Sequence, residues 1–234
     1  MNNTLEKQLA YSRLEALRSQ MNPHFIFNAI TTIQNFILAN DKRLALEYLD
    51  ELSSLIRKFL DHSRADVILL SEELALLISY INLESQRFSN RFGFQLNVAE
   101  DVDADFIEIP PMLLQPYIEN AIRHGLMHKV GYGLLSIDIK KQDNFLVCTI
   151  EDDGIGRKKS AELNAWRPKE HKSVGMEVTK ERLELLNNIH NSQLNVEITD
   201  LYHENKEGAG TRVVLYIPIK DEWTIEEDEN VSNG

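Results

Sequence analysis

The spacing of apolar residues divides the chain into a helical part and a part rich in strands. In the first quarter, apolar residues recur every three or four positions in two runs, separated by the turn-like segment 39–42. This pattern predicts two amphipathic helices that form a hairpin. Ser71, followed by Glu72 and Glu73, is typical of a helix N-cap and predicts a third helix that runs to Arg87. A two-helix hairpin buries little by itself, so we expect two copies to pair as a four-helix bundle.

Beyond Phe92 the pattern changes to alternating apolar and polar residues, which is typical of half-buried strands. The five alternating runs are 92–98, 135–139, 146–150, 194–198 and 213–217. Helical spacing returns at 112–127 and at about 176–189. These elements predict an α+β chain in which the helical hairpin is followed by a two-layer α/β sandwich. We place the domain boundary near Arg87. The predicted regions are a helical domain at 1–87, a second domain at 88–220 and an acidic, disordered tail at 221–234.

Composition and charge exclude some classes of function and indicate where the protein is located. The net charge is −12, and Lys and Arg are scattered rather than clustered, which argues against a direct nucleic-acid partner. The N-terminal sequence has no signal-peptide pattern, and no apolar run approaches the ~20 residues that cross a bilayer. We therefore expect a cytoplasmic location, either of the whole protein or of the inner part of a longer membrane receptor. Cys148, the single cysteine, lies in an alternating run and is expected to be a buried structural thiol.

The segment 22–28, NPHFIFN, places His24 directly after a proline within the first helical stripe. Pro23 removes a backbone hydrogen bond and predicts a kink just before His24. A largely neutral imidazole is a competent nucleophile toward phosphorus, and Asn28, one turn later, could hold the ring in one tautomer. The alternative is an ordinary helix start with Pro23 in the first turn and His24 merely solvated.

Four further segments are weak individually but are informative in their order. In 115–125, Asn120 and His124 share a helix face that suits a magnesium–phosphate group. In 151–156, EDDGIG, a carboxylate after a strand could accept a hydrogen bond from an adenine amino group, and two glycines allow close approach of the backbone. The others are SVGM at 173–176, where helix amides would favour phosphate, and GAGT at 208–211.

On these motifs, from about residue 9 to 219, the chain resembles the LytS/YehU-like sensor histidine kinases. That family joins a helical phosphoacceptor region to an ATPase domain of the gyrase, Hsp90, histidine kinase and MutL superfamily. The resemblance implies a Bergerat-type ATP-binding fold, ATP and Mg²⁺ as cofactors, and autophosphorylation of His24. It also implies a homodimer that passes the phosphoryl group to an aspartate of a response regulator.

The resemblance also assigns roles to single residues. Asn120 would ligate Mg²⁺ and Asp152 would recognise adenine, with Thr211 supporting Asp152. The segment 157–172 would be the mobile lid, and Arg123, His124 and lid lysines such as Lys158 would offset developing charge. Glycines that would border the nucleotide are Gly154, Gly156 and Gly175.

Pro116 bears on the choice between kinase and hydrolase. Water-activating members of the superfamily have a glutamate four residues before the magnesium-binding asparagine, where this chain has Pro116. Without that base, attack by water suffers more than attack by a neutral imidazole, which favours phosphoryl transfer. Glu119 could still act as the base. A non-catalytic nucleotide-binding regulator and a gyrase-like ATPase are the alternatives, and phosphatase activity toward the partner is compatible with the same residues.

Overall fold

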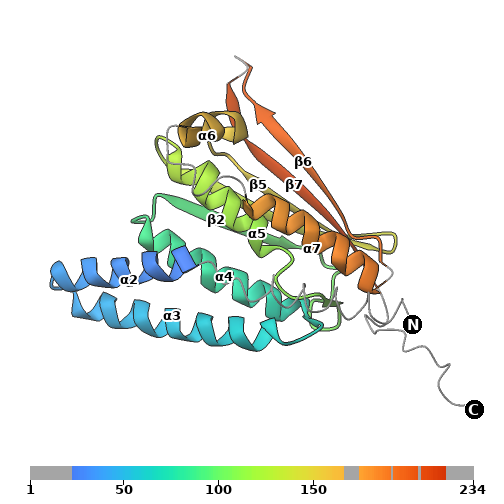
Figure 1. The fold of residues 1–234 in the computed structure, drawn as a ribbon, viewed down its shortest axis with the longest axis horizontal. Coiled ribbons are helices and arrows are strands. Elements are labelled where there is room, and N and C mark those ends of the chain that lie inside the picture. Colours follow the sequence, from blue (N-terminus) through green and yellow to red (C-terminus); the bar gives the residue numbers. More distant parts are fainter. Residues whose placement is uncertain (1–22, 166–173, 191, 205–206, 220–234) are drawn as a thin grey trace, which may run out of the picture.

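The computed structural model describes residues 23–165, 174–190, 192–204 and 207–219. Its N-terminal part contains α2 (Pro23–Leu38) and α3 (Lys42–Ser63), which lie side by side (Figure 1). Asn40 adopts a φ of 60° in the turn between them, and the Asp41 carboxylate caps α3 by accepting a hydrogen bond from the Leu44 amide at 3.0 Å. The predicted hairpin is confirmed. The predicted kink before His24 would fall at the edge of the described residues, because α2 as described begins at Pro23.

The third helix, α4 (Leu70–Arg87), begins two residues earlier than the sequence predicts. Ser71 is not its N-cap, because Leu69 occupies that position and the Ser71 amide donates to the Ala104 carbonyl at 2.9 Å. The Leu70 amide donates to the Ile107 carbonyl at 2.8 Å. A neighbouring loop therefore satisfies the first amides of α4, and no hydroxyl cap is needed.

A mixed five-stranded sheet forms the second part. Its strand order is β2 (Phe92–Val98), β4 (Gly133–Gln142), β5 (Phe145–Asp152), β7 (Gly208–Pro218) and β6 (Asn195–Tyr202). β2 pairs with β4 in parallel, and the other pairs are antiparallel. All five were predicted from alternation, and Cys148 is buried in β5 as expected.

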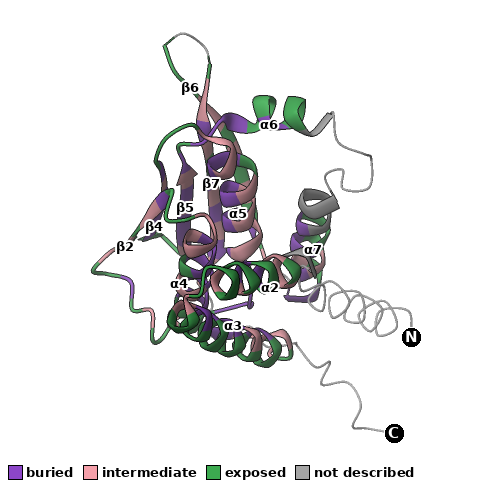
Figure 2. Ribbon diagram, turned by 90° about the vertical axis from the view of Figure 1, so that its left-hand side faces the viewer, coloured by how far each residue is buried: buried purple, intermediate pink, exposed green. Residues whose placement is uncertain are grey.

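Helices cover one face of this sheet. Both ribbon views place α5 (Gln115–Asn120) and α7 (Val174–His190) on the same side, while α6 (Gly156–Ala165) lies at one end (Figures 1 and 2). Alternate strand residues such as Ile137, Cys148 and Leu215 point into the core, which continues through α4 to α3. The predicted helix at 112–127 is broken up: α5 is followed by a π-helical turn, η1 (Ala121–Gly125), and a 3-10 turn, η2 (Leu126–His128).

A small second sheet ties the helical part to the α/β part. β1 (Ile68–Leu69) pairs with β3 (Glu108–Ile109), and both strands are too short for periodicity to predict. Nearby, the buried carboxylate of Glu73 accepts hydrogen bonds from the amides of Met112 at 2.8 Å and Leu114 at 3.2 Å. Arg182 of α7 donates to the carbonyls of Pro111 and Met112. Two helices thus fix the loop that leads into α5.

Candidate active site

Asp152 is a buried carboxylate at the end of β5. Its Oδ1 accepts a hydrogen bond from the Gly154 amide at 2.9 Å, and Thr211 lies opposite it in the β5–β7 register. Burial raises the pKa of Asp152 to about 6, against the lowering effect of the Gly154 and Thr211 amides. The partners named here are uncharged amides, so Asp152 is a fixed acceptor rather than half of an ion pair.

Glycines form the wall around Asp152. A Cβ on Gly125 would collide with the Asp152 carboxylate, and a Cβ on Gly154 would collide with the Gly125 backbone. Gly210 has a φ of 127°, and a Cβ there would overlap the Asp152 carbonyl oxygen. The glycines of three separate motifs therefore meet at one residue, with Gly125 and Gly154 beside the carboxylate of Asp152 and Gly210 beside its backbone carbonyl.

The segment formed by α5 and η1 joins this carboxylate to the rest of the predicted site. Asn120 is the last residue of α5, and Gly125 ends η1 beside Asp152. His124 is exposed, and Arg123 pairs with Glu119 at 2.8 Å.

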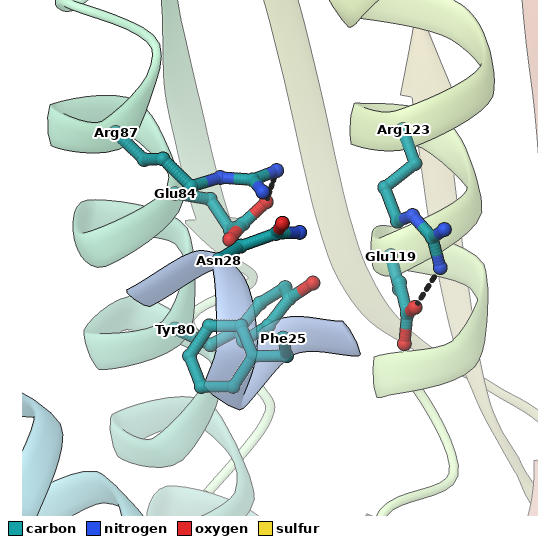
Figure 3. A pocket seen from close by; sticks show the side chains of 7 residues that line it. All are labelled: Phe25, Asn28, Tyr80, Glu84, Arg87, Glu119 and Arg123. Atoms are coloured by element: carbon teal, nitrogen blue, oxygen red, sulfur yellow. Dashed lines mark hydrogen bonds and ion pairs between the residues drawn. The ribbon is translucent and has the colours of Figure 1, made fainter. Parts of the chain in front are cut away.

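Glu119 and Arg123 face the helical part of the chain. They line a narrow pocket with Phe25 and Asn28 of α2 and with three residues of α4 (Figure 3). On the α4 side the lining residues are Tyr80, Glu84 and Arg87, and Arg87 pairs with Glu84 at 2.6 Å. The pocket is too small to admit a ligand. We call these seven residues the charged junction: Phe25, Asn28, Tyr80, Glu84, Arg87, Glu119 and Arg123.

For several other predicted site residues, the structure describes the position in an element but not all of the surroundings. His24 is the second residue of α2 and Gly175 the second of α7, and their surroundings lie outside the described part. Gly156 takes a φ of 74° next to Gly208, where α6 begins. Lys158 is exposed on α6. Of the predicted lid, 157–165 forms most of α6, anchored to β6 by the two hydrogen bonds of Arg157 to Asp200 at 2.6 and 2.9 Å, and 166–172 lies outside the described residues.

The residues near Asp152 fit a purine with an exocyclic amine. A desolvated acceptor, held by a backbone amide and closely surrounded by glycine backbone, suits a flat donor group. Asn120, half-buried at the end of α5, offers an amide oxygen of the kind that Mg²⁺ accepts. The arrangement can thus hold a magnesium nucleotide along one side of α5 and η1.

Sequence reasoning missed Gly125, Gly210 and Glu84 as parts of these sites. Gly125 ends the same motif as Asn120 but reads as a helix C-cap, and Gly210 stands beside the predicted Thr211. Glu84 gave a clearer signal, because it occupies a position in the apolar stripe of α4 that includes Leu77 and Ile81. A charged residue at such a position is rarely buried without a partner.

Two family models match the chain and together span most of it. The model described as histidine kinase matches residues 12–92. The model described as histidine kinase-, DNA gyrase B- and HSP90-like ATPase matches residues 111–221. The first match covers α2, α3 and α4, and the second covers α5, the glycine wall and the strands β4, β5, β6 and β7. Within the described residues, no helix is long and apolar enough to cross a membrane.

Proteins of similar sequence include the sensor proteins named LytS. The sensor protein LytS of Oceanobacillus iheyensis is 32% identical over 222 residues, which are 93% of this chain and 36% of LytS. LytS of Bacillus subtilis is 35% identical over 150 residues, or 64% of this chain and 25% of LytS. The chain thus spans about a quarter to a third of these relatives. The solved Acinetobacter baumannii histidine kinase AdeS is 14% identical, with a TM-score of 0.44, over 86% of this chain and 98% of AdeS.

The family models and the relatives agree with the order of elements described above. The helical hairpin lies within the match to the histidine kinase model, and four of the five sheet strands, β4, β5, β6 and β7, lie within the match to the ATPase model. NPHFIFN and the segments around Asn120, Asp152 and Thr211 occur in the order that the resemblance requires. The chain therefore belongs to the sensor histidine kinase family, with the resemblance to its LytS-like members extending over most of its length.

Proposed function

We propose that this chain is the catalytic core of a two-component signalling system, which uses ATP to phosphorylate His24 and passes the group to an aspartate of a response regulator. The observation that carries the proposal is the continuous α5–η1 segment, whose Gly125 end touches Asp152 while Glu119 and Arg123 meet the helix that bears His24. Nucleotide site and phosphoacceptor helix are thereby joined through a single short element.

In the proposed mechanism the protein mainly positions its substrate. Asp152 accepts a hydrogen bond from the adenine amine, Thr211 supports it, and Gly154, Gly156 and Gly175 leave room for the nucleotide. Asn120 ligates Mg²⁺, which neutralises phosphate charge when it is bound. Arg123, His124 and Lys158 offset the negative charge that develops on the transferred group.

His24 is the nucleophile in this proposal. A ring nitrogen forms the new N–P bond as the P–O bond to ADP breaks, and the resulting phosphorylated imidazolium loses the proton on its other ring nitrogen to Glu119 or to solvent. Asn28, one turn after His24, holds the ring in the reactive tautomer. The phosphorylated imidazole then donates the group to the regulator's aspartate as the N–P bond breaks, and the imidazole takes up a proton, which regenerates neutral His24.

The hairpin provides a surface for a second copy of the chain. α2 and α3 expose several large apolar side chains, with Phe27 68% and Leu38 84% exposed. Isolated helices seldom leave such residues in water, and a four-helix bundle would cover them. The others in this set are Ile30, Ile37, Leu46, Leu49 and Leu60. We propose a homodimer in the cytoplasm, either free or as the inner part of a membrane receptor.

Incubation with γ-labelled ATP and Mg²⁺ tests the kinase proposal. We expect acid-labile label on the chain, because phosphohistidine hydrolyses in acid, and we expect none on His24→Gln. Asn120→Asp should bind nucleotide but incorporate little label. Label that persists in His24→Gln would refute the assignment of the nucleophile, and free phosphate without labelled protein would favour the ATPase alternative.

A further inference from the structure

α4 carries a buried acid that the proposed mechanism does not use. Glu84 is 1% exposed, and its Oε2 accepts a hydrogen bond from Arg87 at 2.6 Å. Within the described residues, Glu84 Oε1 and Arg87 Nε have no hydrogen-bond partner. Desolvating an ion pair costs free energy that apolar residues of the same size avoid, so stability alone is a weak explanation for this pair.

A second ion pair approaches from the opposite side. Figure 3 shows Glu119 and Arg123, on α5 and η1, facing Glu84 and Arg87 across the junction. Burial has the largest effect on Glu84 and raises its pKa to about 7, while Arg87 and Arg123 lower this pKa and Glu119 raises it. Above that pH both acids are ionised, and the four charges sum to zero. The pairs therefore form one electrostatic unit.

α2 fills the space between the pairs. The Asn28 amide lies between them, and the Phe25 ring packs on Tyr80 with centroids 5.1 Å apart (Figure 3). Phe25 directly follows His24, and Asn28 is one turn further along the same helix. Contacts at Phe25 and Asn28 therefore determine where the backbone of His24 lies. On the opposite side, Glu119 directly precedes Asn120.

We propose that Glu84 is a positioning residue for phosphoryl transfer, which together with Arg87 fixes the helix carrying His24 against the helix carrying Asn120. This inference rests on the proposed function. It assigns Glu84 no contact with substrate. Its effect passes through Asn28 and the Glu119–Arg123 pair, and the distance between the two helices determines how often His24 reaches an attacking geometry.

Glu84→Gln keeps the size of the side chain and removes one charge. Two guanidinium groups then face a single carboxylate, so the charges that surround Phe25 and Asn28 of α2 no longer cancel. We expect kcat for autophosphorylation to fall at least tenfold while KM for ATP stays within twofold, because Asp152 and the glycine wall are unchanged. Glu184→Gln is the matched control: it removes the acid of an exposed pair with Lys180 on α7 and should leave kcat unchanged.

Charge compensation separates positioning from a general structural role. Asn28→Asp adds a third carboxylate to the junction and should also lower kcat by several-fold. Combined with Glu84→Gln it restores a net charge of zero, so the double variant should phosphorylate faster than either single variant. Losses that multiply in the double variant, or a Glu84→Gln variant with full kcat, would overturn the proposal. If Glu84→Gln does not fold, an unchanged kcat in Asn28→Asp alone overturns it.

The wild-type chain in the same assay distinguishes the two proposals. Absence of label on wild-type His24 would refute the proposed function and this inference together. Label on the wild type with unaltered transfer in the junction variants would refute only the role of Glu84. A rise in KM that accounts for the whole loss in Glu84→Gln would also refute positioning, because it would place the effect at the nucleotide site.

Discussion

Asp152 and Glu84 are both buried acids, yet their surroundings differ in kind. Burial is the largest cause of a raised pKa in each, to about 6 for Asp152 and about 7 for Glu84. Asp152 accepts hydrogen bonds from backbone amides and is surrounded by glycine, whereas Glu84 pairs with Arg87 and faces another ion pair. Amide partners leave a carboxylate able to accept a further donor, whereas the Glu84–Arg87 pair lies within α4 and faces a second pair on α5 and η1. The first arrangement suits ligand recognition, and the second suits positioning.

Gly210→Ala should have the largest effect, because it disrupts the wall around Asp152. The new Cβ would combine a φ of 127° with overlap of the Asp152 carbonyl oxygen. We expect the free energy of unfolding to fall by about 3–5 kcal/mol, and nucleotide binding to be lost. Urea unfolding followed by circular dichroism measures the change.

Gly131→Ala is the control for backbone strain alone. Gly131 has a φ of 94° with nothing within 4 Å of the added Cβ, so the expected loss is about 1–2 kcal/mol. Equal losses at the two positions would show that the tight contact around Asp152 contributes nothing.

Replacing Asp152 or Glu84 by the corresponding amide should affect nucleotide affinity to different extents. Asp152→Asn replaces a charged acceptor that would receive the adenine amine, so we expect affinity for an ATP analogue to fall about 10- to 100-fold by calorimetry. Glu84→Gln should change it less than twofold. A similar loss in both variants would mean that the junction, rather than Asp152 alone, shapes the nucleotide site.

The pH dependence of stability should differ between the two acids. Each has a folded pKa above its ordinary value, so its contribution to stability is fully present below the ordinary pKa and is lost as pH rises through the folded pKa. For Asp152 the loss falls between about pH 4 and 6, and for Glu84 between about pH 4.5 and 7. Groups that act on Glu84 are Arg87, Glu119, Arg123, Tyr80 and Tyr48.

Thermal unfolding from pH 4 to 8 measures these losses, each on the order of 3 kcal/mol. Wild type should lose stability relative to Asp152→Asn in the lower window and relative to Glu84→Gln in the upper one. Parallel curves for wild type and Glu84→Gln would show that Glu84 titrates as it does in the unfolded chain.

Glu47→Gln should have the smallest effect. Glu47 pairs with Arg43 at 2.7 Å, about the same separation as the buried pairs, but both side chains are more than half exposed. Screening by water leaves such a pair at about 0.3–0.5 kcal/mol. A loss above about 1 kcal/mol would contradict the view that burial, rather than distance, gives the junction its importance.

Periodicity predicted the elements that are long and that bury only one face. The five strands and the α2–α3 hairpin follow from alternation and from three- and four-residue spacing, because each buries one face. β1 and β3 have two residues each, which is too short to show an alternating pattern. The start of α4 was wrong because partners from 104–107, distant in sequence, satisfy its amides. The π-helical turn in η1 brings Gly125 to Asp152, and no local propensity indicates it.

The candidate site was predictable where one motif holds several of its residues. Asp152 and Gly154 share one motif and are joined by a hydrogen bond, and Thr211 lies opposite Asp152 in the sheet, whereas their roles toward a nucleotide stay predictions. The charged junction was not predictable, since Glu84 and Glu119 are 35 positions apart in sequence and their proximity depends on how α4 packs against α5. Pairings of this kind arise from tertiary structure rather than from local sequence.

The loop ahead of α5 has a consequence for how the chain unfolds. Glu73 lies before residue 88 and holds the amides of Met112 and Leu114, while β1 pairs with β3 across the same point. Cutting the chain there would leave two buried amides without their acceptor and β3 without its neighbour. The helical and α/β parts should therefore melt in a single cooperative transition, and a fragment that begins at residue 88 should be less stable than the same residues within the whole chain.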